Sequence, residues 1–339
     1  MKKRLLLLNW RDPWHPKSGG AELVTLRVLE RLAKRGWDVE WFSSLYPGAR
    51  PNEVRCGITF AREGSAATVH LAAVRRYSGM RGNRFSIAVD QINTIPFFTP
   101  FYLNCRKVAF FHQLAREVWL YEAQFPLSIF GFLSEPIYLQ AYRSMPIITV
   151  SPSSAESLKR IGMRGPMHVI PEAVDEECDA SVPTKHPGPD IAIIGRVNPS
   201  KRIPIAIEAA AILRQRGWRG VLHIVGAGSS SYEARIRSMA QTRLGDQVII
   251  HGRVSDERRT KLLRDCSALW MTSVREGWGL VVTEAARHGT PAVVVNVAGL
   301  RDAVQHEITG LVVPANASAV ADATEVLFAD LPRYAGFLF

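Results

Sequence analysis

Apolar runs of strand length alternate with amphipathic stretches of helix length along the whole chain. The apolar runs are continuous, which is typical of strands buried on both faces of a parallel sheet. The runs are RLLLLN (4–9), VEWFS (39–43), SIAVD (86–90), VAFFH (108–112), PIITV (146–150), IAIIG (191–195), VLHIVG (221–226), VIIHG (248–252), ALWMTS (268–273), PAVVVN (291–296) and GLVVP (310–314). Strands alternating with helices predict an α/β protein.

The strand-like runs form two groups, separated by a stretch without apolar periodicity. Residues 175–190, DEECDASVPTKHPGPD, are acidic and then rich in Pro and Gly, which is typical of a linker. We therefore predict two Rossmann-like domains with parallel sheets, over residues 1–174 and 191–339. A chain of 339 residues has room for two such cores.

The composition indicates a globular protein with reduced thiols. The longest nearly uninterrupted apolar run, FPLSIFGFL (125–133), is about half of the roughly 20 residues that a spanning helix needs. The opening MKKRLLLLNW resembles a signal peptide, but Asn9, Arg11 and Asp12 follow too soon, so we expect a buried first strand. The four cysteines form no Cys-x-x-Cys pair, so we expect neither a zinc site nor a disulfide, and a cytoplasmic chain.

The net charge of +11 lies in the first half of the chain. Residues 1–170 carry 23 Lys and Arg against 12 Asp and Glu, whereas residues 171–339 carry 19 of each. A one-sided basic field is typical of a protein with an anionic partner, whether nucleic acid, a phospholipid surface or a phosphorylated substrate. A basic surface that only keeps the protein soluble is the alternative.

The stretch REGWGLVVTE, residues 275–284, joins a predicted strand to a predicted helix through a turn broken by glycines. Gly277 and Gly279 allow the backbone to approach a ligand closely. The N–H groups of Leu280 and Val281, together with the dipole of the helix, favour a phosphate group. We therefore predict an anion-binding turn.

Glu276 and Glu284 flank this turn, eight residues apart. A carboxylate does not help to hold phosphate, so at a nucleotide site the natural partners of both glutamates are sugar or ribose hydroxyls. Such a spacing also arises by chance on solvated helices. The two glycines, the preceding strand and HGTPAVVV (288–295), which predicts a helix end, a turn and another strand, favour a sugar-nucleotide site.

This stretch resembles the E-G-[FW]-G-L-x-x-x-E motif of the retaining glycosyltransferases of family 4, and Glu276 to Glu284 matches it at every fixed place. Such enzymes have the GT-B fold, in which two Rossmann-like domains face each other across a cleft. The resemblance covers about residues 4–328. It implies transfer of a hexose from a nucleoside-diphosphate sugar to a hydroxyl acceptor, with Glu276 on the sugar and Glu284 on the ribose. No Asp-x-Asp metal clamp occurs, so we expect no metal and no cofactor.

A second element lies in IIGRVNPSKRIPIAIEAA (193–210), which predicts a strand, a loop and a helix. Arg196 and Lys201 share the loop, so two cations can meet one diphosphate, arginine as a planar fork and lysine as a point charge. Scattered surface bases are the alternative. From Gly195 to Lys201 the loop resembles the G-R-x-x-x-x-K element that holds the donor diphosphate in the family.

Two features of the first half resemble the family as well. Gly19 and Gly20 lie where the first predicted strand meets a helix, and the resemblance implies that Gly20 admits the donor diphosphate; a plain loop is the alternative. His112 ends the strand VAFFH at the edge where parallel sheets bind ligands. The resemblance implies that His112 contacts the sugar as a catalytic residue, and a structural histidine is the alternative.

The stretch IVGAGSSSYEARI (224–236) has Gly226 and Gly228 but Ser231 where a dinucleotide fingerprint needs its third glycine. No acidic residue ends the next strand, so we reject a nicotinamide site. In the family a turn after this next strand faces the nucleotide base. That turn corresponds to Arg253 and Val254.

Aromatic residues are dense in WLYEAQFPLSIFGFLSEPIYLQAY (119–142). A packed helix is one interpretation, and an apolar lip for a lipid-linked acceptor is the other. The basic aromatic run RRYSGMRGNRF (75–85) would suit an anionic membrane, which would place the protein peripherally at the inner face. Nucleic acid is the less favoured anionic partner.

The chain departs from the family pattern at two places. Family members usually carry Pro-Asn-Gly-Val-Asp before the linker, where this chain has PEAVD (171–175), a change that we expect to alter the hinge. The tail LPRYAGFLF (331–339) stands where the family continues into a helix that returns to the first domain, so we expect a loose hinge and slow transfer. A non-catalytic sugar-nucleotide or polysaccharide-binding protein of the same fold is the alternative function.

Overall fold

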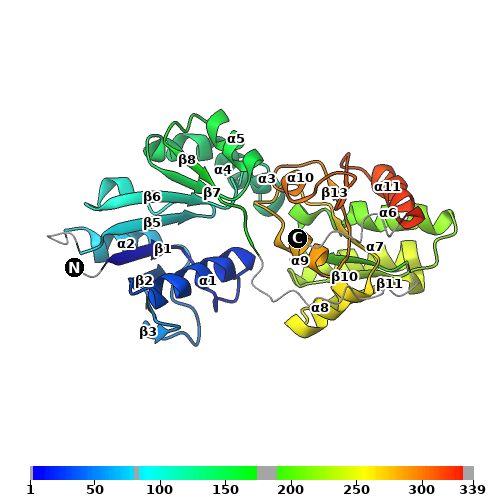
Figure 1. Cartoon of the computed structure of the whole chain (residues 1–339), viewed down its shortest axis with the longest axis horizontal. Coiled ribbons are helices and arrows are strands. Elements are labelled where there is room, and N and C mark those ends of the chain that lie inside the picture. The colour runs from blue at the N-terminus through cyan, green and yellow to red at the C-terminus, as the bar shows by residue number, and fades with distance from the viewer. Residues whose placement is uncertain (1–2, 80–83, 174–188, 331–339) are drawn as a thin grey trace. The chain divides into compact units, whose positions relative to one another are not determined.

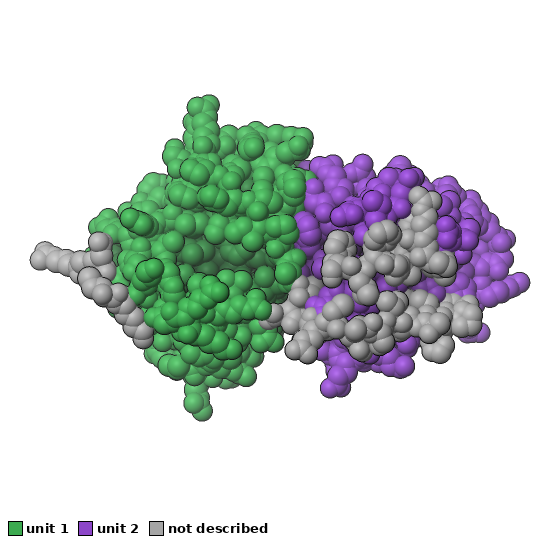
Figure 2. Space-filling view, in the orientation of Figure 1, with its two compact units in different colours: residues 1–116, 130–175 green, residues 117–129, 176–339 purple. Residues whose placement is uncertain are grey.

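The computed structural model describes residues 3–79, 84–173 and 189–330. The linker predicted at 175–190 lies outside the described residues apart from its last two positions, and the apolar tail at 331–339 lies outside them altogether. The described chain forms two compact units, shown in separate colours in Figure 2. Unit 1 comprises Met1–Arg116 and Phe130–Asp175, and unit 2 comprises Glu117–Ile129 and Glu176–Phe339.

Unit 1 contains an eight-stranded sheet in the order β3-β4-β2-β1-β5-β6-β7-β8 (Figure 1). Its strands are β1 (Arg4–Leu8), β2 (Asp38–Ser43), β3 (Asn52–Arg55), β4 (Ile58–Arg62), β5 (Ile87–Ile92), β6 (Arg106–Phe111), β7 (Ile147–Thr149) and β8 (Met167–Val169). Its helices are α1 (Gly20–Lys34), α2 (Val69–Tyr77), η1 (Thr99–Phe101), α4 (Leu127–Tyr138, whose first three residues group with unit 2), η2 (Leu139–Tyr142) and α5 (Pro152–Arg160).

The continuous apolar run of β1 fills both faces of this sheet, as predicted. Leu5 and Leu7 pack in one buried cluster with Leu26 of α1, whereas Leu6 and Leu8 pack in another. Successive side chains of a strand point to opposite faces, so only a run without polar positions can bury both. The first strand is buried, as expected from its sequence.

The β3–β4 hairpin is absent from the sequence prediction, and it makes the sheet of unit 1 mixed rather than all-parallel. β3 pairs antiparallel with β4, while the other neighbouring strands are parallel. The turn consists of Cys56 at φ 55° and Gly57 at φ 74°. Two successive positive φ values are typical of a type I′ hairpin turn, which usually carries Asn-Gly. Cysteine at the first position conceals that signal.

Unit 2 contains a six-stranded parallel sheet in the order β11-β10-β9-β12-β13-β14 (Figure 1). Its strands are β9 (Ile191–Ile194), β10 (Leu222–Val225), β11 (Val248–Gly252), β12 (Ala268–Met271), β13 (Ala292–Val295) and β14 (Gly310–Val313). Its helices are α3 (Val118–Glu122), η3 (Pro199–Lys201), α6 (Ile203–Gln215), α7 (Ser230–Leu244), η4 (Gly245–Gln247), α8 (Asp256–Asp265), α9 (Leu280–Arg287), α10 (Leu300–Ala303) and α11 (Ala317–Ala329). These strands and helices enclose one apolar core.

Residues 117–129 group with unit 2, although the predicted domain boundary placed them in the N-terminal domain. Polar contacts explain the difference. Glu117 lies 2.8 Å from the guanidinium of Arg275, and the N–H of Ser200 donates to Glu122 at 3.2 Å. The aromatic content of this segment gives no indication of these contacts.

Within the described residues, no helix is long and apolar enough to cross a membrane, and no cluster of three or more metal-ligating side chains occurs. The described cysteines, Cys56, Cys105 and Cys266, are free thiols.

Candidate functional site

The strand order of unit 2 reverses between β9 and β12, which lie side by side at the centre of the sheet. The chain runs from β9 to β10 on one side and from β12 to β13 on the other, so the loops after β9 and β12 diverge. Open parallel sheets bind ligands at such a reversal, outside the carboxyl ends of the strands. The two motifs singled out from the sequence, 195–201 and 275–284, follow these two strands.

Direct hydrogen bonds join the two loops. The N–H of Val274 donates to the carbonyl of Ser200 at 2.8 Å, and the hydroxyl of Thr272 donates to the carbonyl of Lys201 at 2.8 Å. Arg202 donates to the carbonyls of Thr272 and Ser273 at 2.8 and 2.6 Å. Sequence reasoning missed Arg202, which has a positive φ of 48° and closes the loop after β9 onto the end of β12. Burial lowers the pKa of the Arg202 guanidinium.

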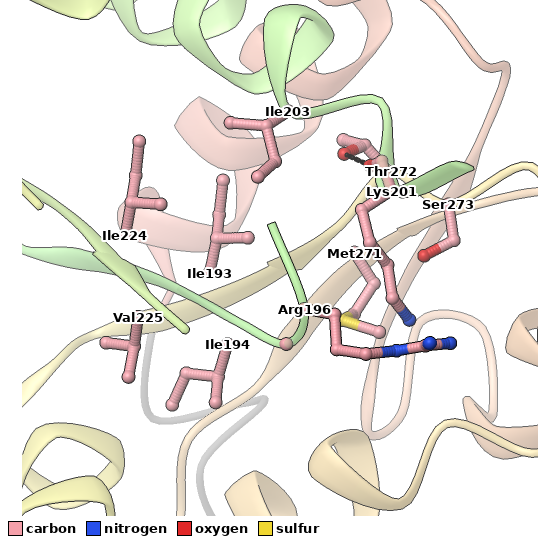
Figure 3. A pocket seen from close by; sticks show the side chains of 11 residues that line it. Ile193, Ile194, Arg196, Lys201, Ile203, Ile224, Val225, Met271, Thr272 and Ser273 are labelled. Carbon is pink, nitrogen blue, oxygen red and sulfur yellow. Dashed lines mark hydrogen bonds between the residues drawn. The ribbon is translucent and has the colours of Figure 1, made fainter. Parts of the chain in front are cut away.

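A small pocket lies between these loops, and both predicted cations line it. Figure 3 shows the side chains of Arg196 and Lys201 extending to the same side of the pocket. The Arg196 guanidinium is exposed and makes no hydrogen bond or ion pair with any described residue, whereas the Lys201 ammonium is paired with Glu276. The predicted clamp therefore has one available cation and one that already has a carboxylate partner.

Glu276 uses one of its two oxygens for contacts within the protein. Its Oε1 receives the ammonium of Lys201 and accepts a hydrogen bond from the hydroxyl of Ser273 at 2.6 Å. Its Oε2 has no hydrogen-bond partner in the described part of the chain and is the oxygen available to a ligand hydroxyl. The side chain is 15% exposed, so a ligand can reach it from solvent. Sequence reasoning missed Ser273, which carries no motif signal.

The predicted glycine-broken turn and helix start are confirmed. Gly279 has φ 96° and precedes α9, which begins at Leu280. A Cβ on Gly279 would meet Leu300 at 3.0 Å, so both the backbone conformation and the packing require glycine there. The first turn of α9 carries no acidic side chain, so the N–H groups of Leu280 and Val281 face no competing carboxylate from their own turn.

Glu284 lies one turn further along α9 and has a cationic partner. Its carboxylate is 3.5 Å from the guanidinium of Arg259 on α8. A ribose hydroxyl that reaches Glu284 therefore meets a carboxylate whose charge is already partly balanced. The sequence pattern contains no indication of Arg259, because α8 lies outside both motifs.

Gly226 and Gly228 serve the packing of the protein itself. A Cβ on Gly226 would lie 1.8 Å from the carbonyl oxygen of Gly195, and a Cβ on Gly228 would lie 1.7 Å from that of Val197. The two glycines thus let the loop after β10 pass against the loop after β9, which explains them without a dinucleotide.

Arg253 and Val254, the predicted base contacts, follow the edge strand β11. Arg253 is exposed, and Val254 packs against the core. They lie outside the two loops that hold the cations and Glu276.

The sheet of unit 1 reverses between β1 and β5, and Gly19 and Gly20 follow β1 as predicted. The N–H of Gly19, however, donates to the carboxylate of buried Glu22 at 2.8 Å, and Arg11 and Asn9 donate to the other oxygen of that carboxylate. The carboxylate of Glu22 therefore occupies the amide of Gly19, while the diphosphate contact expected at Gly20 stays a prediction. Glutamate three residues after a helix N-cap is the capping-box spacing, so the sequence contained this signal.

His112 lies at the carboxyl end of β6, as predicted, and it is buried. Its Nδ1 is 2.5 Å from a carboxylate oxygen of Glu172, and its Nε2 is 2.7 Å from the amide nitrogen of Gln91. Both ring nitrogens thus have partners in unit 1. Sequence reasoning missed both partners.

The packed-helix interpretation of residues 119–142 is wrong for one face of α4. Phe130, Leu133 and Ile137 are 68%, 62% and 72% exposed. Their spacing places them on a single helix face.

Of the arginines in the run 75–85 that were expected to form a basic surface, Arg81 lies outside the described residues and two others are paired. Arg76 forms ion pairs with Glu63 and Glu40, and Arg84 pairs with Glu40 as well. Arg75, in contrast, is exposed and has no ion-pair partner among the described residues.

Two protein families match the chain, one over each half. The family described as Glycosyltransferase Family 4 matches residues 18–177, and the family described as Glycosyl transferases group 1 matches residues 174–335. The chain belongs to the group 1, family 4 glycosyltransferases. The sequence resemblance is thereby confirmed.

Solved structures agree on the fold. A sucrose-phosphate synthase from Thermosynechococcus elongatus has a TM-score of 0.78 and 21% identity, with 99% of this chain and 92% of that one covered. The Anabaena protein HepE in complex with UDP-glucose has a TM-score of 0.74 and 17% identity, over 98% of this chain and 92% of that one. The fold of this glycosyltransferase-family chain is therefore GT-B, as expected.

Curated relatives match over a shorter stretch. The D-inositol 3-phosphate glycosyltransferase of Nocardia farcinica is 32% identical over 152 residues, which are 43% of this chain and 34% of the relative. The match spans about a third of the length of the first relatives of this kind.

Proposed function

We propose that the protein is a retaining glycosyltransferase that moves a hexose from a nucleoside-diphosphate sugar to a hydroxyl acceptor. The observation that carries this proposal is the arrangement at the reversal point of unit 2. There Arg196 and Lys201 line one pocket, and Glu276, on the neighbouring loop, offers Oε2 beside them. Cations for a diphosphate and a carboxylate for hydroxyls are the two requirements of a sugar nucleotide.

The ion pair between Lys201 and Glu276 implies an order of events when a ligand binds. When a diphosphate enters, Arg196 binds it first, since its exposed guanidinium has no partner among the described residues. The ammonium of Lys201 then moves from Glu276 to the phosphate oxygens, because two phosphate groups carry more negative charge than one carboxylate. This move releases Oε1 of Glu276, so both of its oxygens can accept hydrogen bonds from the sugar.

In the reaction, the bond between the sugar C1 and the phosphate oxygen breaks and its electrons go to the diphosphate. The acceptor oxygen forms the new bond to C1 on the same face of the sugar, and its proton passes to the departing phosphate oxygen. Arg196, Lys201 and the N–H groups at the start of α9 stabilise the charge that develops there. These groups supply the countercharge that a metal supplies elsewhere, so we propose a reaction without metal or cofactor.

The acceptor side of the proposal concerns α4. A face with Phe130, Leu133 and Ile137 exposed is larger than an isolated surface leucine and is typical of a binding surface. Together with the excess of Lys and Arg in residues 1–170, it favours a lipid-linked acceptor at an anionic membrane. We therefore propose a cytoplasmic protein that binds peripherally at the inner face, in glycolipid, cell-surface polysaccharide or glycoconjugate synthesis.

Vesicle sedimentation tests the acceptor side. The wild-type chain should sediment more with anionic than with neutral vesicles, and Leu133→Ser with Ile137→Ser should reduce the difference. Val326→Ser, which replaces an exposed apolar side chain of α11, is the matched control. Equal sedimentation with both vesicle types would indicate a soluble acceptor.

A panel of nucleotide sugars tests the reaction. UDP-glucose is the first donor to try, because the HepE structure contains it. A phosphorylated polyol is the first soluble acceptor, because the Nocardia farcinica relative is named for inositol 3-phosphate. One donor should raise the melting temperature and undergo slow hydrolysis, and faster transfer when an acceptor is present.

Two outcomes would replace the proposal. Stabilisation without hydrolysis or transfer by any donor would favour the non-catalytic binding protein. No stabilisation by any nucleotide sugar, with a gel shift of nucleic acid, would favour a nucleic-acid binder.

A further inference from the structure

A buried chain of hydrogen bonds runs through unit 1 from α1 to the residues just before the predicted linker. The amide nitrogen of Gln91, near the end of β5, donates to the hydroxyl of Thr25 at 3.1 Å and contacts Nε2 of His112 at 2.7 Å. On the other side of the ring, Nδ1 lies 2.5 Å from Oε1 of Glu172. All four residues are at most 9% exposed.

With the amide nitrogen of Gln91 facing the ring, the hydrogens in this chain of hydrogen bonds have a consistent assignment. The hydroxyl of Thr25 donates to the carbonyl of Ala21 at 2.8 Å, so its oxygen is left as an acceptor for the amide NH₂ of Gln91. The second hydrogen of that NH₂ points to Nε2 of His112, which must therefore be the acceptor nitrogen. The proton of the neutral ring is then on Nδ1, and it is donated to Glu172.

Glu172 sets the donor-to-acceptor direction of the hydrogen bonds in this series. A buried carboxylate has only acceptor oxygens, so it requires a donor and stabilises the Nδ1–H form of the ring. A buried carboxylate also costs several kcal/mol if it is unpaired, which makes its partner obligatory. Asparagine, which the family usually has at this position, would impose neither condition because its amide can also donate.

We propose, on the basis of the transfer reaction proposed above, that Glu172 is a positioning residue for His112. It holds a ring proton on Nδ1, so that in the neutral ring the lone pair is on Nε2. A substrate hydroxyl that reaches the ring displaces the amide of Gln91 and donates a hydrogen bond to Nε2. His112 thus acts toward the substrate as a hydrogen-bond acceptor.

Glu172 lies close in sequence to the predicted linker. It is followed by one further described residue, Ala173, before the predicted linker at 175–190. Its hydrogen bond to His112 therefore ties the start of the linker to the ring, so a change in the path of the chain at 171–173 changes the orientation of the imidazole.

The first test is the tautomer of His112, measured by ¹⁵N NMR of the full chain with labelled histidine. His112→Asn identifies the signal by its disappearance, since the chain has nine histidines. The wild-type signal should be that of a neutral ring protonated on Nδ1. In Glu172→Ala the acceptor is gone, and the signal should change to the Nε2–H form. A wild-type ring protonated on Nε2, whether alone or together with Nδ1, would overturn the proposal.

The second test separates binding from turnover. In Glu172→Ala and Glu172→Gln, kcat should fall about 10- to 100-fold, by analogy with the loss of a partner that orients a metal-ligating histidine. The affinity for free nucleoside diphosphate, which unit 2 binds, should change less than about twofold, far below the tenfold that about 1.4 kcal/mol represents. Glu156→Gln is the matched control, because it removes one exposed carboxylate from the same unit and should leave kcat unchanged.

The outcomes are distinct from those of the proposed function. If the wild-type chain turns over no donor, the proposed function fails, while the NMR spectrum still decides the tautomer. If Glu172→Ala unfolds, the isosteric Glu172→Gln carries the kinetic test, with the melting temperature as its check. A kcat within about twofold of wild type in a folded Glu172 variant would contradict the positioning role.

Discussion

Replacing Glu276 with glutamine should make the protein bind free nucleoside diphosphate more tightly while it transfers sugar more slowly. The carboxylate of Glu276 holds the ammonium of Lys201, so a diphosphate has to compete for that cation. Glutamine keeps the shape and can still accept a hydrogen bond from Ser273, but it has no charge with which to retain the lysine.

The magnitude follows from the partial exposure of the pair. Two unit charges about 4 Å apart interact by about 4 kcal/mol at an effective dielectric constant of about 20. The side chains of Lys201 and Glu276 are 19% and 15% exposed, so water screens part of this interaction. Hydration of the ammonium that Glu276 no longer holds offsets a further part of the interaction energy. About 1 kcal/mol of net free energy should therefore favour diphosphate binding in Glu276→Gln. That free energy corresponds to roughly fivefold tighter binding of the diphosphate.

Calorimetry with UDP and with pyrophosphate measures the gain in diphosphate affinity. Turnover with a nucleotide sugar measures the loss in the rate of transfer. Glu208→Gln is the control, since it removes the same charge from α6, where Glu208 pairs with Arg243. A Glu276→Gln protein that binds diphosphate no more tightly than the Glu208→Gln protein would refute the competition between carboxylate and phosphate. Unchanged turnover would refute the contact of Glu276 with the sugar.

Three further predictions concern metal, a turn and pH. Transfer should survive excess EDTA, because Arg196 and Lys201 supply the countercharge; loss of activity that Mn²⁺ or Mg²⁺ restores would contradict this. Cys56→Asn should raise the free energy of unfolding by about 0.5 kcal/mol, since asparagine is favoured at a positive φ in this turn, and a lower melting temperature would contradict the turn assignment. Burial, with the neighbouring His223, lowers the pKa of His251, so the folded protein favours the neutral ring. The unfolded chain takes up a proton below a pH of about 6.5, so the folded state loses stability as the pH falls below that value. His251→Gln should therefore lose less thermal stability on acidification than wild type, and identical losses would contradict the assignment.

The sequence predicted the parts of the fold that depend on apolar periodicity. All eleven predicted strands exist, because continuous apolar runs such as IAIIG have few ways to be buried other than in a covered parallel sheet. Three strands among the described residues were missed, namely β3, β4 and the three-residue β8. β3 is largely exposed, and its turn carries Cys56 in place of the usual asparagine. Such strands are held by pairing with a neighbour, which single-strand periodicity does not reveal.

The candidate site was predictable where the backbone itself makes the ligand surface. Gly279 and the start of α9 follow from local geometry, so the sequence indicated them correctly. The partners of the motif residues were not predictable, because they come from distant segments. Arg259 reaches Glu284 from another helix, and Glu172 reaches His112 across 60 positions of sequence. Hydrogen bonds between such positions leave no periodic or spacing signal.

The central claim is that the loops after β9 and β12 in unit 2 hold the diphosphate of a sugar nucleotide. The most direct test is calorimetric titration of the stabilising nucleotide sugar into wild type, Arg196→Ala and Lys201→Ala. The account predicts that each variant loses more than about 1.5 kcal/mol of binding free energy, as expected for a charge-assisted contact, with melting temperatures near that of wild type. Unchanged affinity in both variants would contradict it.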